Sequence, residues 1–386
     1  MRFPPWLGVL FEKCKSNLLL VVLLFFFAVL VVAVLVLGLS LFVDEAVMMV
    51  NWETIGTIVG LLVVTTGMKL SNYFYLVGER ILRRVRTPRN LVLVLTLFTV
   101  VLSAFVTNDV ALFVVVPLTI SMCELAGEDL GGKMVKLVVF ETIAANVGSS
   151  LTPIGNPQNI FVWHKSGVSF LGFLTVMAPF EIVLLSLLLL YEFLVFRGHN
   201  REIGCKVSSV KEWKLDRRLF VGSVAVFVAF LAFCDLDMVL VAVVLVVAVY
   251  AVFFRGTFRR VDWMLIAIFV LMFIDTGLAV KVFNALLPGL VYSLNDPIFL
   301  FVTSILLSQV ISNVPATIFL SQFTGNWRTL LYGVNVSGNG TLIASLANVI
   351  SFRLIIDKRG FIKDFHKHSL IYLLVSAAAL SLFILR

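Results

Sequence analysis

Long apolar stretches, separated by short polar and basic segments, run through the whole chain. About 20 consecutive apolar residues are enough for a helix to cross a bilayer. The pattern predicts spans near 17–43, 54–75, 134–165, 170–196, 218–234, 238–254, 261–283, 328–355 and 367–385. Two further apolar stretches, 89–122 and 297–325, are each interrupted by a short polar motif. We therefore expect an all-α polytopic membrane protein with about nine full spans.

Basic residues indicate how the two interrupted stretches are placed. If both enter and leave the membrane on one side, every basic cluster falls on the same face, which the positive-inside rule makes the cytoplasmic one. Both stretches are therefore predicted to be re-entrant helical hairpins, with the N-terminus cytoplasmic and Arg386 outside. The clusters are Lys13 and Lys15, Arg80 to Arg89, Arg197 to Arg218, Arg255 to Arg260, and Arg353 to Lys367.

Two of the spans carry the same polar interruption. Residues Asn146–Asn159 and Asn335–Asn348 are rich in Gly, Ser, Asn and Thr, and they coincide at Asn, Val, Thr, Ile and the final Asn. Backbone at membrane depth must be hydrogen-bonded inside the protein or face a watery cavity. We therefore expect broken helices at 134–165 and 328–355, an arrangement that indicates a transporter's binding site.

The hairpin motifs are duplicated as well, at 103–109 and 308–314, and Thr66-Gly67 matches Thr276-Gly277. With the topology above, the first hairpin opens to the cytoplasm and the second to the outside. The order and opposite orientation predict an inverted repeat. The first half is 1–196, with hairpin 89–122; the second is 235–386, with hairpin 297–325; a basic loop and one connecting span at 197–234 join them.

Helix ends exposed at tips and breaks suit ions, because N-termini attract anions and free carbonyls attract small cations. Neutral Ser, Thr and Asn side chains add oxygen ligands, although the same residues also join helices in lipid. Na⁺ is expected near Thr107, Asn108 and Gly148, and near Ser312, Asn313 and Gly338; no other cofactor is expected. The full set of candidate substrate- or ion-binding residues is Ser103, Thr107, Asn108, Asp109, Asn146, Gly148, Ser149, Thr152, Gly155, Asn156, Asn159, Ser308, Ser312, Asn313, Thr317, Asn335, Ser337, Gly338, Asn339, Thr341 and Asn348.

Three carboxyls lie at or near predicted membrane depth: Asp109, Glu141 and Asp275. Intramembrane acids are costly and usually functional, so each is a candidate for proton or Na⁺ coupling. Asp109 is favoured because the second tip has Val314 in its place. For Glu141 and Asp275 the alternative is a lysine partner at a watery edge, with candidates Lys69, Lys136 and Lys281.

Composition supports the membrane class: 61% of residues are hydrophobic, 13% are charged and mean hydropathy is +1.08. The net charge of +8 is attributed to orientation signals beside anionic lipid, so no nucleic-acid partner is expected. Four scattered cysteines predict free thiols. The four histidines fall in loops or at span ends, which argues against a zinc site or a buried proton relay.

Thr107-Asn108-Asp109-Val110-Ala111 and Ser312-Asn313-Val314-Pro315-Ala316-Thr317 resemble the twin tip motifs of the ion transporter superfamily. That group includes ArsB-type arsenite permeases, NhaD-type Na⁺/H⁺ antiporters, citrate–metal transporters and divalent-anion/Na⁺ symporters. The resemblance covers roughly 54–355. It implies a scaffold domain, a mobile transport domain, a homodimer and elevator-type alternating access. Asp109 and Thr341-Leu342-Ile343-Ala344 depart from the dicarboxylate and arsenite patterns, respectively.

The leading hypothesis is a secondary active transporter in the cell membrane that moves a small anion or oxyacid, driven by Na⁺ or H⁺. Arsenite or antimonite efflux and Na⁺/H⁺ antiport remain alternatives. An intramembrane aspartyl enzyme, suggested by Asp275-Thr276-Gly277, is remote because the matching Thr65-Thr66-Gly67 has no acid. A passive channel would need no twin hairpins of opposite entry. The chain has no Gly-x-x-x-x-Gly-Lys-Ser/Thr loop for ATP.

Overall fold

The computed structural model describes residues 18–39, 43–82, 85, 87–126, 133–197, 213–287 and 294–384, and the long regular elements within them are all helices. The fold is therefore all-α, as predicted. The helices are α2 (Leu18–Val36), α3 (Val43–Met49), α4 (Trp52–Leu70), α5 (Tyr73–Leu82), α6 (Pro88–Val106), α7 (Asn108–Ala126), α9 (Met134–Gly148), α10 (Pro157–Ser166), α11 (Phe170–Val195), α12 (Arg217–Asp235), α13 (Val239–Phe253), α14 (Arg255–Phe258), α15 (Trp263–Leu286), α16 (Pro297–Ile311), α17 (Asn313–Leu320), α18 (Trp327–Val336), the 3₁₀ turn η2 (Leu342–Ala344), α19 (Leu346–Leu354) and α20 (Lys358–Ile384).

Six of the described helices are long and apolar enough to cross a membrane: α4, α6, α11, α12, α15 and α20. Shorter apolar helices are α2, α13 and α16. Pairs α9/α10 and α18/α19 each complete one interrupted crossing. The protein is a multi-pass membrane protein of the predicted fold class.

Three predicted span boundaries were wrong. The span at 17–43 ends at Val36, shortly before Gly38 adopts a left-handed conformation (φ 66°). The span at 54–75 ends at Leu70, because Asn72 adopts a left-handed conformation (φ 62°) and its amide donates to Lys214 O at 2.9 Å, so that α5 is a separate helix. Asparagine tolerates this conformation better than most residues. The last span begins at Lys358 rather than at residue 367, since long basic side chains can extend from a helix end toward water.

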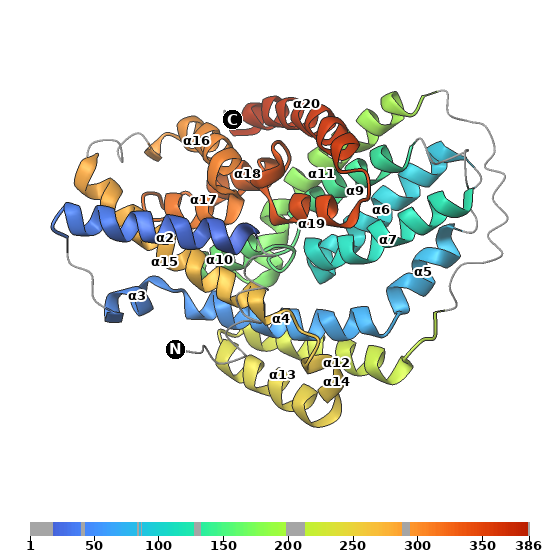
Figure 1. The fold of residues 1–386 in the computed structure, drawn as a ribbon, viewed down its shortest axis with the longest axis horizontal. Coiled ribbons are helices and arrows are strands. Elements are labelled where there is room, and N and C mark those ends of the chain that lie inside the picture. Colours follow the sequence, from blue (N-terminus) through green and yellow to red (C-terminus); the bar gives the residue numbers. More distant parts are fainter. Residues whose placement is uncertain are drawn as a thin grey trace, which may run out of the picture.

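Both interrupted stretches form helix–break–helix hairpins, α6–α7 and α16–α17. Each begins at a capped N-terminus followed by proline: Thr87 accepts from Asn90 N at 3.3 Å, and Asp296 from Phe299 N at 2.7 Å. Proline is well suited to the first helical position, where no intrahelical N–H bond is needed. Figure 1 shows the open ends of the two hairpins at opposite ends of the molecule and their breaks toward the middle.

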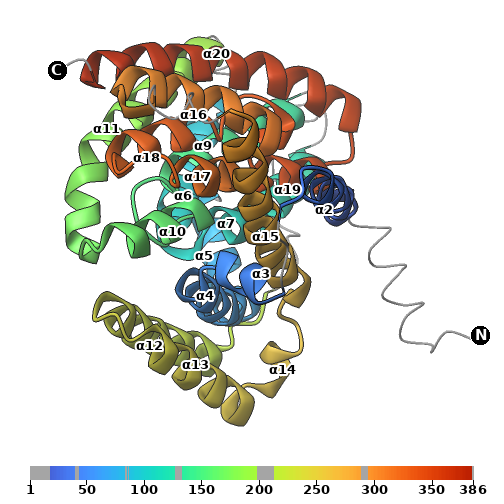
Figure 2. The ribbon, with the colours of Figure 1, turned by 90° about the vertical axis from the view of Figure 1, so that its left-hand side faces the viewer.

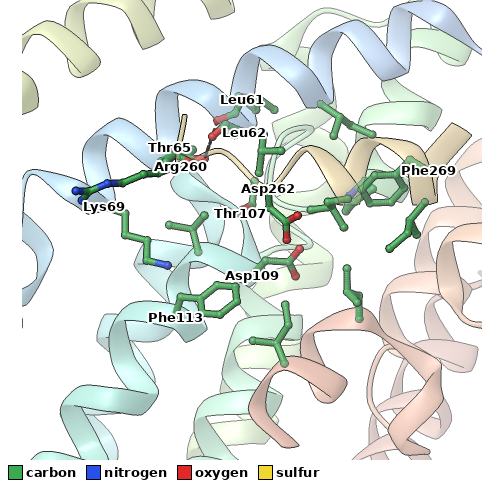
Figure 3. A pocket seen from close by; sticks show the side chains of 18 of the residues that line it. Leu61, Leu62, Thr65, Lys69, Thr107, Asp109, Phe113, Arg260, Asp262 and Phe269 are labelled. Atoms are coloured by element: carbon green, nitrogen blue, oxygen red, sulfur yellow. Dashed lines mark hydrogen bonds between the residues drawn. The ribbon is translucent and has the colours of Figure 1, made fainter. Parts of the chain in front are cut away.

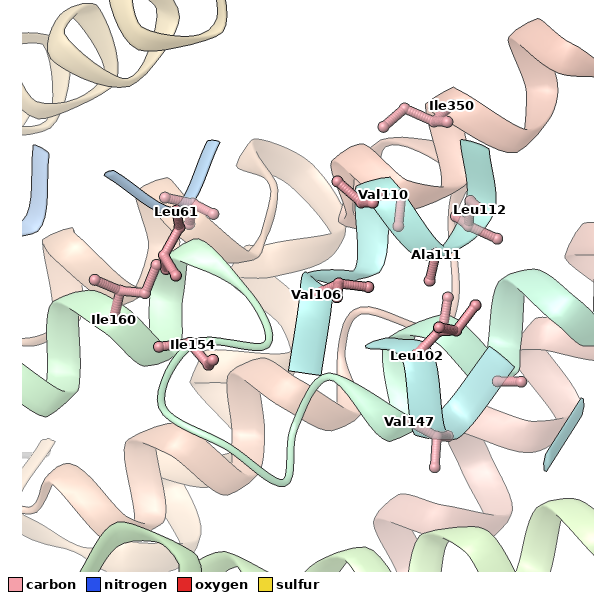
Figure 4. Close-up of a cluster of buried hydrophobic side chains, with 14 of the residues drawn as sticks. Leu61, Leu102, Val106, Val110, Ala111, Leu112, Val147, Ile154, Ile160 and Ile350 are labelled. Atoms are coloured by element: carbon pink, nitrogen blue, oxygen red, sulfur yellow. The ribbon is translucent and has the colours of Figure 1, made fainter. Parts of the chain in front are cut away.

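The two broken helices cross the centre between the hairpins. α9 packs on α6 and α7, while α18 packs on α16 and α17; each second piece packs on the other hairpin, α10 on α17 and α19 on α7. The packing of two hairpins against two broken helices brings both tips and both breaks together. Figure 4 shows apolar side chains around this region, including Val106, Val110 and Val147 from the first half and Ile350 from the second.

A second group of helices lies on one side of this centre. α4, α12 and α13 pack on one another, and α2 packs along α15 (Figure 2). Tyr250 of α13 is fully buried at this packing surface, where its hydroxyl donates to Ser223 Oγ at 2.6 Å. The arrangement separates a hairpin-containing core from a flanking layer.

Candidate functional site

The two hairpin tips have the same backbone geometry. Thr107 has φ 77° and ψ 149°, and Ser312 has φ 75° and ψ 155°. A positive φ is rare for a β-branched residue such as threonine and carries a cost of roughly 1–3 kcal/mol. The break leaves Asn108 and Asn313 as the first residues of α7 and α17. The sequence match between the tips is therefore also a structural match.

The two unwound segments are held together by reciprocal hydrogen bonds between asparagine side chains. Asn146 Nδ2 donates to Asn348 Oδ1 at 2.8 Å, and Asn335 Nδ2 donates to Asn159 Oδ1 at 2.8 Å. The first asparagine of each repeated segment thus bonds the last asparagine of the other. All four side chains are buried.

The last asparagine of each segment also donates hydrogen bonds to backbone carbonyls of its own segment. Asn159 Nδ2 donates to Ser149 O and Thr152 O at 3.2 and 2.9 Å, and Asn348 Nδ2 donates to Gly338 O and Thr341 O at 2.9 and 3.1 Å. Carbonyls freed by the breaks are thereby satisfied, as buried backbone groups require.

Two glycines permit the close approach of these segments. A Cβ on Gly148 would lie 2.3 Å from Val100 O, and one on Gly155 would lie 2.1 Å from Ser149 O. A Cβ on Gly338 would be at ordinary contact distance, 3.4 Å from Asn146. In the second break the tight position is instead Gly340, where φ is 138° and a Cβ would lie 2.2 Å from Gln309 Oε1.

A small chamber lies between the tips. Its volume is about 70 Å³, and it is lined by Asn108, Asp109, Pro157, Gln158, Phe269, Met272, Ser312, Asn313, Val314, Ile343, Ser345, Leu346 and Val349. Asn108 is 4% exposed, and its Oδ1 has no hydrogen-bond partner among the described residues. A buried acceptor left unpaired is costly, so this oxygen is suited to a ligand that brings a donor or a cation.

A larger cavity of about 330 Å³ adjoins the chamber and shares Asp109, Pro157, Phe269 and Leu346 with it. Lys69, Arg260 and Arg353 also line this cavity. Figure 3 shows the carboxyl groups of Asp109 and Asp262 pointing toward one another, from the first tip and from the start of α15. Asp262 precedes α15 yet makes no side-chain capping bond, which leaves its carboxyl directed at the cavity.

The remaining predicted residues divide by what their polar groups contact. Thr107 lines the larger cavity, and Ser312 Oγ is 3.4 Å from Ala344 O. Asn156 donates to Asn335 Oδ1 at 3.0 Å, Asn339 accepts from Asn146 at 3.4 Å, and Thr341 donates to Gln309 O at 3.2 Å. A further group lies outside the chamber lining, and the hydroxyls of its residues donate to backbone carbonyls: Ser103, Ser149, Thr152, Ser308, Thr317 and Ser337.

The other predicted acids lie elsewhere. Glu141 accepts from the Thr119 hydroxyl and is 1% exposed. Asp275 is 7% exposed, and neither of its oxygens has a partner among the described residues. It lines a third cavity, of about 540 Å³, beside α2, which shares Met272, Ser312, Ile343 and Val349 with the chamber. Of the three lysines considered as partners, Lys281 instead pairs with Glu45 at 2.7 Å.

Several residues near the site were not identified from the sequence. Asp262 fell at the start of the predicted span 261–283 and was not considered. Ser345 was passed over although it occupies the position equivalent to Asn156; its Oγ donates to Asn146 Oδ1 at 3.1 Å. Glu181 and Glu192 were absorbed into a long apolar run in α11. Both glutamates lie inside a predicted span, and this position could have identified them as functional candidates.

Two minor predictions can also be compared with the structure. Cys123 and Cys234 are free, as expected, while Cys14 and Cys205 lie outside the described residues. The prediction that every histidine falls in a loop or at a span end was wrong for His368: α20 begins earlier than expected, so His368 is buried inside it.

Comparison with known proteins agrees with this architecture. Residues 6–326 match the family model CitMHS, described as Citrate transporter. The inner membrane protein YbiR of Escherichia coli is 40% identical, over 88% of this chain and 91% of that protein. An uncharacterized transporter of Methanocaldococcus jannaschii is 34% identical, over 80% and 83%. The silicon efflux transporter LSI3 of Oryza sativa subsp. japonica is 26% identical, over 80% of each chain.

The matched residues include the first hairpin, the first break and the second tip. The family and two of these three similar proteins are described as transporters rather than enzymes, and Asp275 and Asp109 line different cavities. The resemblance seen in the tip motifs is thus confirmed: the chain belongs to the CitMHS citrate transporter family and is a membrane transporter.

Proposed function

We propose that this transporter moves a small oxyacid, as a neutral or singly charged species, by secondary active transport through the cell membrane. The observation that carries the proposal is the unpartnered Asn108 Oδ1 in the tip chamber. A hydroxyl of an oxyacid satisfies this acceptor, whereas a fully deprotonated anion brings only further acceptors.

The chamber's size and charge support a small substrate. About 70 Å³ has room for only a few water-sized groups. Among the described residues that line it, none is Lys, Arg or His, and a multiply charged tricarboxylate usually needs such cations. The substrate class implied by the rice relative's name, a silicon compound, fits this chamber better than citrate, after which the family is described.

For the driving ion, we propose Asp109 as the first carrier. It lies at the boundary between the chamber and the larger cavity and faces Asp262 across that cavity. Two facing carboxyls favour uptake of a proton or a cation, because their charges repel when both are ionised. Na⁺ is supported at Asn108, with its unpaired oxygen, more than at Gly338, whose carbonyl already accepts from Asn146 and Asn348.

The facing carboxyls also favour a second candidate function, Na⁺/H⁺ antiport, in which the cation itself is the cargo. In either case we propose an elevator motion of the hairpin-containing core against the layer of α4, α12 and α13, in a homodimer. Asp109 of the core and Asp262 at the start of α15 face one another in a cavity that α4 also lines, which supports a proton or cation effect on this movement.

Purified protein in liposomes tests the proposal. Arsenite, silicic acid and citrate serve as probes, with Na⁺ and pH gradients imposed separately. We expect arsenite or silicic acid to accumulate under one gradient and citrate to be excluded. Citrate accumulation would overturn the substrate assignment. Sodium-driven proton movement without any probe would favour the antiport alternative.

A further inference from the structure

A row of buried titratable side chains lies between α11 and α20, apart from the tip chamber. Glu181 and Glu192 are on α11, three helical turns apart and on the same face. They are 5% and 2% exposed. Tyr372 of α20 is 1% exposed and lies within electrostatic range of both carboxyls.

One end of the row touches the first unwound segment. Ser150, between α9 and α10, donates its hydroxyl to Glu181 Oε2 at 2.5 Å. The carbonyl of Ser150 in turn accepts from Asn159 Nδ2 at 3.2 Å. Glu181 is therefore linked, through one serine, to the crossed amides that hold the two breaks together.

The other end approaches a charged surface. Tyr191 and His368 share a hydrogen bond of 2.8 Å, and His368 Nε2 has no partner among the described residues. Tyr191 is the chain neighbour of Glu192, whose Oε1 accepts from the Thr96 hydroxyl of α6. The titratable and charged groups that face the row from the packed helices are Arg89 of α6, which lies over the Phe193 ring beside Glu192, Glu141 and Lys136 of α9, and Asp364, Lys367, His368 and Tyr372 of α20.

Packing alone does not account for these acids. A buried carboxyl with an unpaired oxygen destabilises a membrane protein, and an apolar side chain of similar size would avoid the cost. Glu181 Oε1 and Glu192 Oε2 are both unpaired among the described residues. Each carboxyl therefore has one oxygen fixed by a hydroxyl and a second available to a proton.

We propose that Glu181 and Glu192, with Tyr372 beside them and the Tyr191–His368 pair at the Glu192 end, form a pathway that carries the coupling proton to the Glu181 carboxyl beside Ser150. The inference rests on the proposed function and extends it by placing a proton route outside the substrate chamber. A proton enters at His368 and protonates the Glu192 carboxylate. Because the two carboxyls are about three helical turns apart, it then reaches the Glu181 carboxylate through bridging water molecules. Each transfer breaks one O–H or N–H bond and forms another, and a following proton restores the donor.

Glutamine variants in the full-length protein test the pathway. Glu181→Gln and Glu192→Gln preserve shape and remove the proton-carrying group; exposed Glu124→Gln on α7 is the matched control. Arsenite–arsenite exchange and pH-driven arsenite accumulation are measured in the same liposomes, with silicic acid as a second probe. We expect both pathway variants to retain exchange and to lose accumulation, and the control to retain both. Retained pH-driven accumulation in Glu181→Gln would overturn the pathway.

A second measurement does not depend on any substrate. Infrared difference spectra of the lipid-embedded protein, recorded during a pH titration, report the C=O band of protonated carboxyls. We expect Glu181→Gln and Glu192→Gln each to lose part of this band, while Tyr191→Phe slows its appearance after a pH jump. Unchanged bands in both glutamine variants would overturn the inference even if neither probe is transported, whereas lost bands without transport would overturn only the substrate proposal.

Discussion

Asn146 Nδ2 lies 2.8 Å from Asn348 Oδ1, although the two residues are 202 positions apart and belong to different halves of the chain. The equivalent contact joins Asn335 to Asn159 at the same distance. These asparagines therefore hold the two breaks against one another, which is a structural role that precedes any contact with a substrate.

Replacement of Asn146 by alanine should destabilise the protein by about 1–3 kcal/mol, because partners such as Asn348 and Ser345 are left with unmet polar atoms. Thermal unfolding in detergent measures the change. Exposed Asn90→Ala on α6 is the control and should have little effect. In a double-mutant cycle, the effects of Asn146→Ala and Asn348→Ala on stability should be strongly non-additive. Additive effects would contradict a direct hydrogen bond between the two side chains.

Asn108→Ala should behave differently from Asn146→Ala. Its Oδ1 has no described partner, so the substitution should leave stability nearly unchanged while lowering transport at least about tenfold, the effect of losing on the order of 1.4 kcal/mol of ligand binding. Arsenite and silicic acid uptake provide the measurement. Asn313→Ala at the second tip should also impair uptake. Normal uptake in both variants would assign the tips to helix packing.

Asp109→Asn should separate exchange from accumulation. The amide keeps the shape and removes the ionisable group that faces Asp262, so probe exchange should persist while accumulation under an ion gradient is lost. Asp262→Asn is the partner variant and should change the pH or Na⁺ dependence in the same direction. Unchanged gradient dependence in Asp109→Asn would make its carboxyl structural.

Alanine at one glycine of each break, Gly155 and Gly338, should show whether glycine is needed there for lack of space or for chain flexibility. Gly155→Ala brings a Cβ to 2.1 Å from Ser149 O, so we expect overpacking to cost about 1–3 kcal/mol or more and to impair folding. Gly338→Ala meets its nearest atoms at 3.4 Å and should be tolerated. Size-exclusion profiles and thermal unfolding compare the two. Equal tolerance would show that the first break can relax around a methyl group.

Single cysteines test the predicted topology. Positions Arg89 and Lys133 flank the first hairpin and should be labelled from the cytoplasmic side. Positions Asp296 and Trp327 flank the second and should be labelled from outside. Labelling of residues 89 and 133 from opposite faces would contradict the re-entrant hairpin, and reversal of all four would contradict only the orientation inferred from basic clusters.

The architecture was accessible from sequence because lipid leaves few ways to place a polar break. The interruptions at Thr107 and Ser312 and those after Asn146 and Asn335 all became hairpin tips or unwound segments. The end of α4 was missed because hydropathy does not register the left-handed conformation of Asn72, which its bond to Lys214 helps to hold.

The sequence did not predict which polar residues line the chamber and which hold the breaks together. Asn108 and Asn146 look alike in sequence, yet one oxygen is unpaired and the other side chain is bonded to the opposite half. That difference depends on residues about 200 positions away. Asp262 was likewise hidden, because only the packing of α15 directs its carboxyl toward Asp109.

The unmet acceptor at Asn108 has a practical consequence for identifying the cargo. An empty carrier bears the cost of a desolvated oxygen, and a ligand that supplies a proton donor or a cation removes it. The true ligand should therefore raise the melting temperature of detergent-solubilised protein in proportion to the logarithm of its concentration above Kd. A library of small inorganic acids and salts can be ranked by thermal shift, with Asn108→Ala as the background, before any vesicle is prepared.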